Sequence, residues 1–336
     1  MSNPLRAGLA LAFSVLAVSC LIVSQMGGRP ATLVVAAQTG PGVAAAGSGP
    51  AATGAGPAGT GSGPAGTGAG PAATGSGPGP AGSGPAGTGG PGSGRRQVTP
   101  ACALSLDPHA ATVAPGTCTV LEVGDSLGND LGFGLRRQLP SSSGLTLVQL
   151  DKSSTGLANP GFWDWPAEMA TYLAQYHPQL VVICLGGNDQ QGIEVSGTAL
   201  QFPSASWQSA YSARIRQMLN EATSAGAYVA WVGLPVMQQP SYAQGAALLD
   251  SLYQKAVATD ADAIFIPTWS YMAGLGGAFA SSAAVNGVRT TIRAADGVHL
   301  TYPGEDVLAT YVIQQLASAM HVALAPATPA VITGRY

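Results

Sequence analysis

The chain has 336 residues and a formal net charge of −3, and charged residues make up only 9% of it, against roughly 25% in ordinary globular proteins. Glycine and proline are concentrated in residues 36–94, a stretch without charges that cannot bury a core. Residues 97–336 hold nine Lys and Arg and all 16 acidic residues, a net charge of −7, which excludes the basic surface typical of nucleic-acid binding.

The chain begins with an apolar segment. Residues 7–26 follow Arg6 and contain no charge, and about 20 such residues can cross a bilayer as a helix. We expect residues 1–28 to be an export signal, and three forms of it stay open. An uncleaved signal anchor is favoured because the segment exceeds the usual secretory length; the others are a cleaved signal peptide and a lipoprotein signal ending at Cys20. Each places the following domain outside the cytoplasm, anchored to the cell membrane or secreted.

Residues 36–96 are expected to form a disordered linker. Its prolines recur every seven residues between Pro50 and Pro85, each preceded by glycine. Glycine does not occupy every third position, which excludes a collagen helix, and the repeat lacks the apolar positions of a coiled coil. Gly/Ser-rich composition predicts a flexible chain with a mean span of roughly 40–45 Å. Such a linker provides reach through a cell envelope, or is simply a spacer.

The cysteines agree with an exported location. Cys102 and Cys118 are separated by 16 positions, and in an oxidising compartment a disulfide between them would contribute about 3 kcal/mol. Cys184 lies in an apolar run and is expected to be buried. No Cys/His spacing is typical of a metal site, and neither a P-loop nor a complete G-x-G-x-x-G motif occurs. We therefore expect no metal and no cofactor.

The domain 97–336 alternates short apolar runs with helical patterns. This alternation predicts an α/β fold with a mostly parallel sheet covered by helices on both faces. Ligands of such folds bind outside the carboxyl ends of the strands, so chemistry is expected there. The expected strands are 119–123, 145–150, 180–185, 228–232 and 263–266, and the expected helices are 129–138, 166–176, 206–225, 243–258 and 304–320.

Three of these strand or loop ends carry polar side chains. Ser126 lies in the sequence Gly-Asp-Ser-Leu-Gly (124–128) at a strand-to-helix turn; it is a nucleophile beside a helix N-terminus or merely an N-cap. Asn188 follows the third strand, where it places an amide at the edge or only forms a turn. Asp296 precedes His299 by three residues in a loop before the last helix.

Together these residues supply a hydroxyl, a base, an orienting acid and a donor for an oxyanion, as acyl transfer requires. Of the four histidines, only His299 lies in a predicted edge loop beside an acid. Residues 124–128 also match the G-x-S-x-G elbow of α/β-hydrolases. Position excludes that fold, because Ser126 follows the first clear strand and Asp296 is close to His299.

These blocks resemble those of the SGNH/GDSL hydrolase superfamily, over the region 124–299. The resemblance implies a three-layer flavodoxin-like domain and a serine esterase, with Ser126 as nucleophile, His299 as general base and Asp296 as its orienting acid. It further implies an oxyanion hole formed by the backbone N–H groups of Ser126 and Gly156 and the side chain of Asn188. Gly156 is assigned because it lies where the second of the family's four blocks is expected and is the one glycine there.

Residues near these blocks are candidates for substrate contact. Phe162, Trp163 and Trp165 follow Gly156 closely and either line a substrate subsite or pack in the core. Arg293 either contacts substrate or pairs with an acid. Asp125 and Asp189 are expected to be structural, bonding the backbone of their turns.

The leading hypothesis is an exported serine esterase that removes an acyl group, expected to be acetyl, from an envelope or extracellular glycan. An O-acyltransferase that passes the acyl group to an envelope sugar would use every one of the same residues. A catalytically idle surface-binding module on a stalk is the third hypothesis, and the intact set of Ser126, His299 and Asp296 argues against it. The expected partners are an acyl ester substrate and the membrane through residues 1–28.

Overall fold

A computed structural model describes residues 101–336. The expected signal segment 1–28 with Cys20 and the expected linker 36–96 lie outside the described residues. Among the helices from residue 101 onward, none combines the length and the apolar character that a membrane crossing requires.

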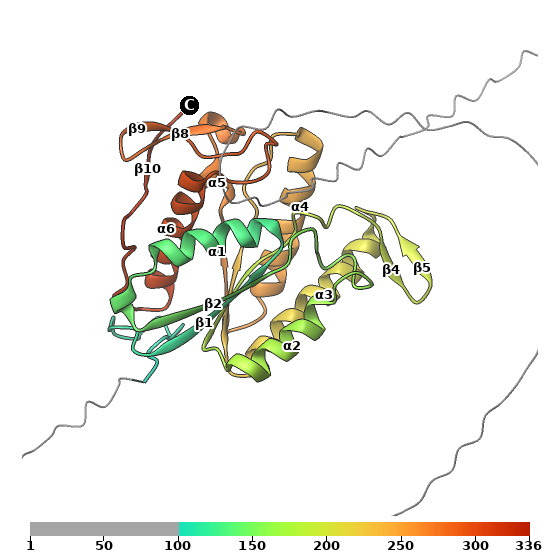
Figure 1. Cartoon of the computed structure of the whole chain (residues 1–336). Helices are drawn as coiled ribbons and strands as arrows, with labels where there is room; N and C mark the ends of the chain where they lie inside the picture. Colours follow the sequence, from blue (N-terminus) through green and yellow to red (C-terminus); the bar gives the residue numbers. More distant parts are fainter. Residues whose placement is uncertain (1–100) are drawn as a thin grey trace, which may run out of the picture. The chain divides into compact units, whose positions relative to one another are not determined.

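The described residues form an α/β fold around a five-stranded parallel sheet (Figure 1). The strand order is β2-β1-β3-β6-β7. β2 therefore lies on one side of β1, and β3, β6 and β7 follow on the other side. The two strands beside β1 therefore end at the same edge as β1 itself. The strands are β1 (Cys118–Gly124), β2 (Leu145–Asp151), β3 (Leu180–Cys184), β6 (Tyr228–Val232) and β7 (Ala263–Ile266).

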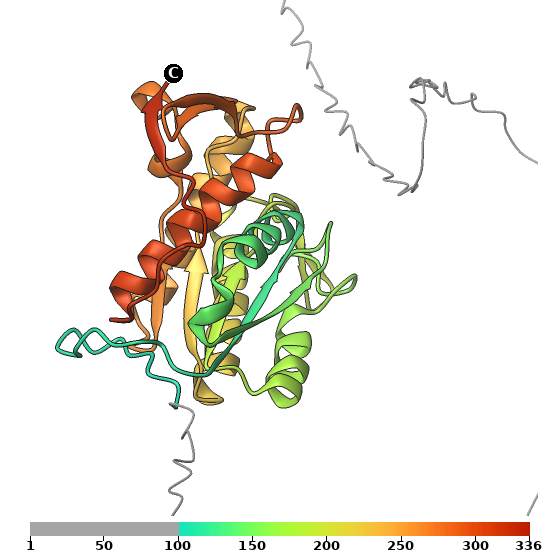
Figure 2. The ribbon, with the colours of Figure 1, turned by 60° about the vertical axis from the view of Figure 1, so that its left-hand side comes forward.

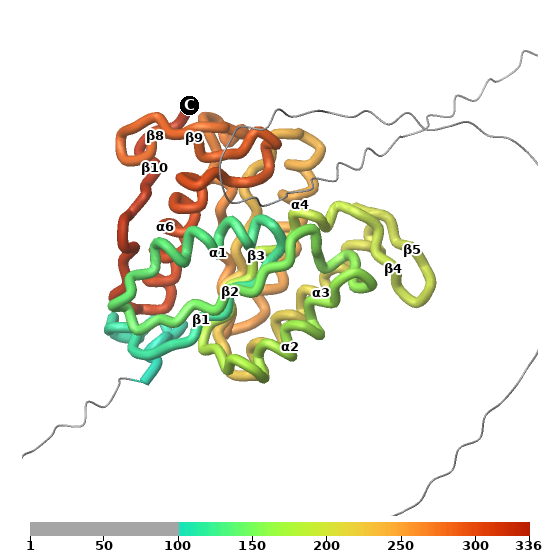
Figure 3. The backbone as a smooth tube through the Cα atoms, viewed as in Figure 1, coloured from blue at the N-terminus to red at the C-terminus, as the bar shows by residue number. Residues whose placement is uncertain are grey.

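Helices cover both faces of this sheet and complete three layers. α1 packs against α6, whereas α2 packs against α3 and α3 against α4; Figures 2 and 3 show α1 and α6 on one side of the sheet and α2 and α3 on the other. The helices are α1 (Ser126–Gln138), α2 (Trp165–Tyr176), α3 (Ala205–Ser224), α4 (Pro240–Val257) and α6 (Tyr302–Ala319). The expected fold class is confirmed.

The burial of the central strands explains why they could be predicted from the sequence. Every residue of β3 is buried, because a central strand covered on both faces needs apolar side chains at all its positions. β2 lies at an edge of the sheet and is only partly buried. Helix starts differ from the expected ones by up to three residues: α1 begins at Ser126, and α4 begins at Pro240, where the missing proline N–H costs the helix nothing.

The sequence patterns did not predict the smaller elements. A hairpin of β4 (Ile193–Val195) and β5 (Thr198–Leu200) follows β3, and β10 pairs with β8 and β8 with β9 in an antiparallel sheet at the C-terminal end (Figure 1). These strands have only three or four residues and, unlike the four-residue β7, are not continuous runs of large apolar residues. The remaining elements are the helix α5 (Trp269–Met272), the strands β8 (Ser282–Val285), β9 (Val288–Thr291) and β10 (Ile332–Arg335), and 3₁₀ turns at Ser141–Ser143 and Leu275–Gly277.

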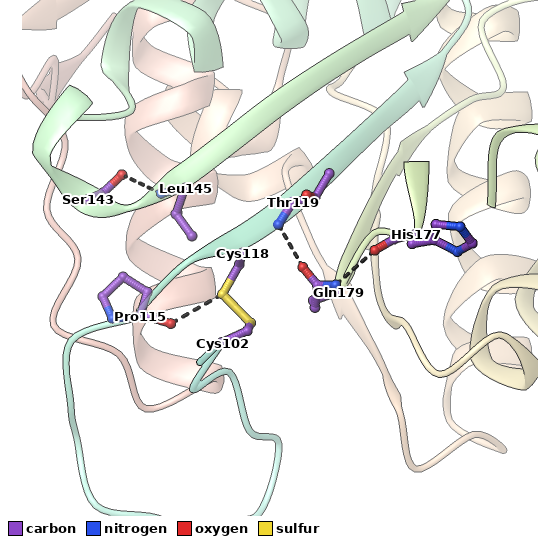
Figure 4. Close-up of a disulfide and its surroundings, with 8 residues drawn as sticks. All are labelled: Cys102, Pro115, Cys118, Thr119, Ser143, Leu145, His177 and Gln179. Atoms are coloured by element: carbon purple, nitrogen blue, oxygen red, sulfur yellow. Dashed lines mark hydrogen bonds between the residues drawn. A yellow bond between two sulfur atoms is a disulfide. The ribbon is translucent and has the colours of Figure 1, made fainter. Parts of the chain in front are cut away.

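A disulfide joins Cys102 to Cys118, as expected (Figure 4). Cys118 is the first residue of β1, so the bridge ties the segment that enters the domain to the central sheet. In the next residue, the Thr119 N–H donates a hydrogen bond to Gln179 Oε1, at 2.7 Å. Cys184 is free and buried, also as expected.

Candidate active site

Ser126 is the first residue of α1 and follows β1 after a single residue. The helix is capped by Asp125, whose carboxylate accepts a hydrogen bond from the Leu127 N–H at 2.9 Å. The N-cap interpretation of Ser126 is therefore wrong, and its hydroxyl is available to another partner. A Cβ atom at Gly124 would lie 2.3 Å from the Cys184 carbonyl oxygen, so only glycine lets the ends of β1 and β3 approach this closely.

Two hydrogen bonds join Ser126, His299 and Asp296 in a line. Ser126 Oγ lies 2.8 Å from His299 Nε2, and His299 Nδ1 lies 2.7 Å from Asp296 Oδ2. The side chains of His299 and Asp296 remain 36% and 50% exposed, so the line is open to a substrate from solvent. The tautomer with a proton on Nδ1 leaves Nε2 free to accept the serine proton.

Hydrogen bonds keep Asp296 ionised. Partial burial opposes ionisation, but the His299 ring and the backbone N–H groups of Val298 and His299 donate to its carboxylate. The donors outweigh burial and hold the pKa of Asp296 below its ordinary value. A charged carboxylate at this place can orient the imidazole and stabilise it when it accepts a proton.

Gly156 and Asn188 lie on two segments that are bonded to each other. Asn188 Nδ2 donates to the Thr155 carbonyl oxygen at 3.0 Å, and the Ala158 N–H donates to Asp189 Oδ1 at 2.7 Å. A Cβ atom at Gly156 would lie 2.1 Å from Asp189 Oδ1, so this position requires glycine. The segments follow β2 and β3, the two neighbours of β1, which brings both residues to the sheet edge that carries Ser126.

Asp125 holds this edge together from inside. It is fully buried, and its Oδ2 accepts hydrogen bonds from the N–H groups of Gly186 and Gly187, at 3.0 and 2.7 Å. Burial raises its pKa to about 7, against the opposing effect of these donors. Asp189 is equally buried and accepts from Tyr211 Oη at 2.6 Å. Both contacts agree with the structural roles expected for the two acids.

Arg293 lies in the interior, in contact with the turn between Asp296 and His299. Its side chain is 1% exposed, and its guanidinium donates to the carbonyl oxygens of Val236 and Val298, both at 2.7 Å. Burial lowers its pKa to about 10, although Asp296 and Asp130 favour its charged form. The guanidinium therefore holds the turn between Asp296 and His299 against the loop that follows β6, a place different from the one expected for a substrate contact.

Asp130 is a further contact of this turn that the sequence interpretation missed. It lies one helical turn after Ser126 on α1, and its Oδ2 accepts a hydrogen bond from the Leu300 N–H at 2.8 Å. Burial raises its pKa to about 6, against the effects of this donor and of the positive charge on His299. The spacing of four residues, which puts two side chains on one helix face, was the signal that could have identified it.

The three aromatic candidates have different surroundings. Trp165 is fully buried, and its Nε1 donates to Thr155 Oγ1 at 3.0 Å, so it supports the segment before Gly156 from below. Trp163 is half-buried, with the Lys152 ammonium 5.0 Å from its ring centroid. Phe162 is 57% exposed. Burial excludes Trp165 from direct contact with a substrate in this structure, whereas Phe162 is accessible.

The arrangement as a whole combines the features of an acyl-transfer site. A hydroxyl contacts an imidazole, which contacts a carboxylate, and the Ser126 N–H lies in the first turn of α1, where backbone N–H groups have no helical partner. Such a helix start favours an anion. The four sequence blocks that resemble the SGNH/GDSL superfamily thus lie at one edge of a sheet with the expected topology.

Comparisons with known proteins found similar solved structures and one matching family. Similar solved structures include one named TesA (20% identity, TM-score 0.41, covering 60% of this chain and 99% of that chain). A GDSL-like lipase from Bacteroides thetaiotaomicron (18%, 0.41, 60% and 88%) and a catalytic mutant of an acetylxylan esterase from Geobacillus stearothermophilus (14%, 0.43, 59% and 94%) are also similar. A search among curated proteins found no match. The family described as "Protein of unknown function (DUF459)" matches residues 119–315, more than half of the chain, and the protein therefore belongs to this family.

Proposed function

We propose that this protein is an exported serine esterase that hydrolyses a carboxylic ester through an acyl-serine intermediate. The observation that carries the proposal is the pair of hydrogen bonds from Ser126 Oγ to His299 Nε2 and from His299 Nδ1 to Asp296, 2.8 and 2.7 Å long. This geometry matches the order of nucleophile, base and orienting acid that acyl transfer needs.

In the first step, Ser126 Oγ attacks the ester carbonyl carbon while His299 Nε2 takes the hydroxyl proton. The carbonyl oxygen becomes an oxyanion, which the N–H groups of Ser126 and Gly156 and the amide of Asn188 stabilise; removing one such donor typically costs about 3–4 kcal/mol. The tetrahedral species collapses as the C–O bond to the alcohol breaks, and His299 returns its proton to the departing alcohol oxygen. An acyl-Ser126 ester remains.

In the second step, His299 removes a proton from water, and the resulting hydroxide attacks the acyl carbonyl. Collapse of this second tetrahedral species breaks the bond to Ser126 Oγ, which regains a proton from His299, and the carboxylic acid leaves. A sugar hydroxyl in place of water would make the protein an O-acyltransferase, with the same residues in the same roles.

The proposed substrate is an acetyl ester on an envelope or extracellular glycan. Support comes from the apolar run at residues 7–26 and the repeat at residues 50–85, which suit a tethered enzyme that works near a cell surface. The Cys102–Cys118 disulfide is typical of an oxidising compartment outside the cytoplasm. We therefore propose that the catalytic domain lies outside the cytoplasm, held by the N-terminal segment or released if that segment is cleaved.

The test is release of p-nitrophenol from p-nitrophenyl acetate and longer esters by the full-length protein and by Ser126→Ala. We expect a burst followed by steady turnover in the unsubstituted protein, with activity lost by about 10³–10⁴-fold or more in the variant. A soluble glycan acceptor, present or absent, separates the two reactions. Turnover that ignores the acceptor supports an esterase, and turnover that the acceptor accelerates, with acylated product, identifies a transferase.

Equal p-nitrophenol release by both proteins would contradict the proposal. If neither releases p-nitrophenol, labelling with a fluorophosphonate decides between the remaining possibilities. Labelling that depends on Ser126 would identify a serine enzyme of narrow specificity, whereas its absence would favour the non-catalytic binding module.

A further inference from the structure

A groove with a volume of about 520 Å³ lies between the two segments that carry the proposed oxyanion donors. Residues 158–161, which follow Gly156, form one wall, and residues 191–194, which follow Asn188, form the other together with Ala199. Figure 1 shows the hairpin β4–β5, which contributes the second wall, projecting beside the start of α3. This volume falls within the range of sites that hold a ligand of several rings.

Hydrogen bonds connect the walls of the groove to the proposed site. The first wall begins at Ala158, whose N–H donates to Asp189 Oδ1 at 2.7 Å. On the second wall, Gln191 Nε2 donates to the Asn188 carbonyl oxygen at 2.7 Å. The groove therefore opens where the proposed oxyanion donors end, and a substrate whose ester lies at Ser126 can extend into it.

Polar and apolar atoms contribute about equally to the lining of the groove, and its larger exposed side chains are polar. Ile193 is buried and Ala158 is small, so neither offers a channel for a long acyl chain. The side chains of Asn159, Gln191 and Glu194 are exposed. Amide and carboxylate groups at a rim can exchange hydrogen bonds with the hydroxyls of a ligand, which suits an alcohol with many hydroxyls better than a fatty acyl group.

The charge of the groove restricts its ligand further. Glu194 has no hydrogen bond or ion pair to any side chain within residues 101–336, and the domain that carries it has a net charge of −7. The Lys152 ammonium lies over the Trp163 ring, 5.0 Å from its centroid, and Lys152 is not part of the lining. An anionic ligand would meet an uncompensated carboxylate.

We propose that this groove binds the alcohol portion of the ester and that this portion is an uncharged oligosaccharide, with Glu194 excluding anionic chains. The inference rests on the proposed esterase function.

The experiment compares three acetyl esters with the full-length protein: p-nitrophenyl acetate, an O-acetylated neutral tetrasaccharide such as cellotetraose, and an O-acetylated tetragalacturonate. We expect kcat/KM to be about tenfold or more higher for the neutral than for the anionic tetrasaccharide. Glu194→Lys should raise kcat/KM for the anionic substrate by about three- to tenfold, and this gain should shrink at high salt. Asn159→Leu should lower kcat/KM for the neutral tetrasaccharide by about two- to tenfold, the value of a lost hydrogen bond.

Two internal controls accompany these measurements. p-Nitrophenyl acetate is too short to enter the groove, so its kcat/KM should stay within about twofold in both variants. Glu221→Lys makes the same charge change on α3 near its far end, whereas Trp207, near the start of α3, is the residue that contacts Gln191. This variant should leave the preference between the two tetrasaccharides as it is.

Binding measured without catalysis separates the two proposals. Calorimetry with Ser126→Ala and unacetylated cellotetraose or tetragalacturonate should give binding of the neutral chain only, and Glu194→Lys should admit the anionic one. Equal effects of Glu194→Lys and Asn159→Leu on all three esters, or equal binding of both tetrasaccharides, would overturn the groove proposal while leaving the esterase intact. Binding as expected with no Ser126-dependent turnover would overturn the esterase and leave the groove as a glycan-binding site.

Discussion

Two carboxyl groups near the first turn of α1 have opposite surroundings. Asp296 is half-exposed and receives hydrogen bonds from the His299 ring and two backbone N–H groups. Glu122 lies inside the fold below α1, fully buried, and neither of its oxygens receives a hydrogen bond from a donor in the described part of the chain. The pKa of Asp296 is lowered, whereas burial and then the nearby Asp151 raise the pKa of Glu122 well above its ordinary value.

Burial and hydrogen-bond donors together decide which acid is ionised, since Asp125 has donors and its pKa is still raised by burial. Asp296 is held ionised where an imidazole can use its charge, and Glu122 is held neutral, because burial without donors disfavours a carboxylate. The glycines of α1 make the second arrangement possible: a Cβ atom at Gly132 would lie 2.6 Å from Glu122 Oε2. Glu122 and Asp296 each lie three or four residues before a residue of the proposed site, and their burial and hydrogen-bond partners distinguish them.

The largest expected effect concerns Asp296 itself. Asp296→Asn should lower kcat for p-nitrophenyl acetate by about 10³–10⁴-fold, because an amide at this position no longer stabilises the protonated imidazole or selects its tautomer. The melting temperature should change little, since the side chain is half-exposed. Steady-state kinetics and thermal unfolding measure the two quantities, and a variant that keeps a tenth of the activity would contradict the role given to Asp296.

Arg293 tests how firmly the turn around Asp296 is held. Arg293→Lys cannot donate to the carbonyl oxygens of Val236 and Val298 together, so we expect kcat to fall by about 10–100-fold through misplacement of His299. Methylguanidinium added to Arg293→Ala should restore part of the activity, which a merely structural loss would not allow. Arg216→Lys, an exposed change of the same kind on α3, is the matched control and should have no effect.

Asp130 should have a smaller effect with a dependence on pH. Its carboxylate attracts the positive charge that His299 acquires, and its pKa of about 6 means that this attraction weakens below that pH. Asp130→Asn keeps an acceptor for the Leu300 N–H but removes the charge, so kcat/KM should fall by about three- to tenfold at pH 8. The pH profile of kcat/KM should lose an inflection near pH 6, and an unchanged profile would exclude this role.

Glu122 should matter least for activity and show its effect in stability. Its folded-state pKa lies above that of the unfolded chain, so the folded state binds the proton more tightly. Its contribution to stability is therefore fully present below about pH 4 and declines as pH rises toward the folded-state pKa. Glu122→Gln removes this decline.

In urea unfolding, the free energy of unfolding of Glu122→Gln should increase relative to that of the unsubstituted protein between pH 5 and pH 9. Its activity at pH 7 should stay within about twofold of that of the unsubstituted protein. A difference between the two proteins that stays constant across this range would mean that Glu122 is ionised in the folded state.

Much of the fold could be predicted because its signals are local. The runs at 119–123 and 180–185 are apolar because central strands are covered on both faces, and residues 124–128 follow a strand directly. The hairpin β4–β5 and the sheet β8–β9–β10 were missed because their short strands mix polar or small residues with apolar ones and depend on tertiary packing.

The candidate site divides in the same way. Ser126 and Asn188 could be identified because strand ends of a parallel sheet meet at one edge. Asp296 and His299 could be identified because an acid lies three residues before a histidine in a loop ahead of the last helix. The burial of Arg293 and Trp165 could not be predicted, because the sequence does not show whether a cationic or aromatic side chain faces solvent or the interior. The hydrogen bond from Arg293 to Val236 joins segments that are distant in the sequence. The hydrogen bond from Trp165 to Thr155 depends on how the loop between these two residues folds.

The sequence by itself thus determined the α/β class, the order of the larger helices and strands and the residue types of the acyl-transfer site, because each depends on neighbouring residues or on the rules of parallel sheets. Only the tertiary structure decided which acid is ionised, which cation is buried and where a groove opens beside Asn188. These properties depend on the number of donors around a group and on its separation from water, and both arise when distant segments of the chain pack together.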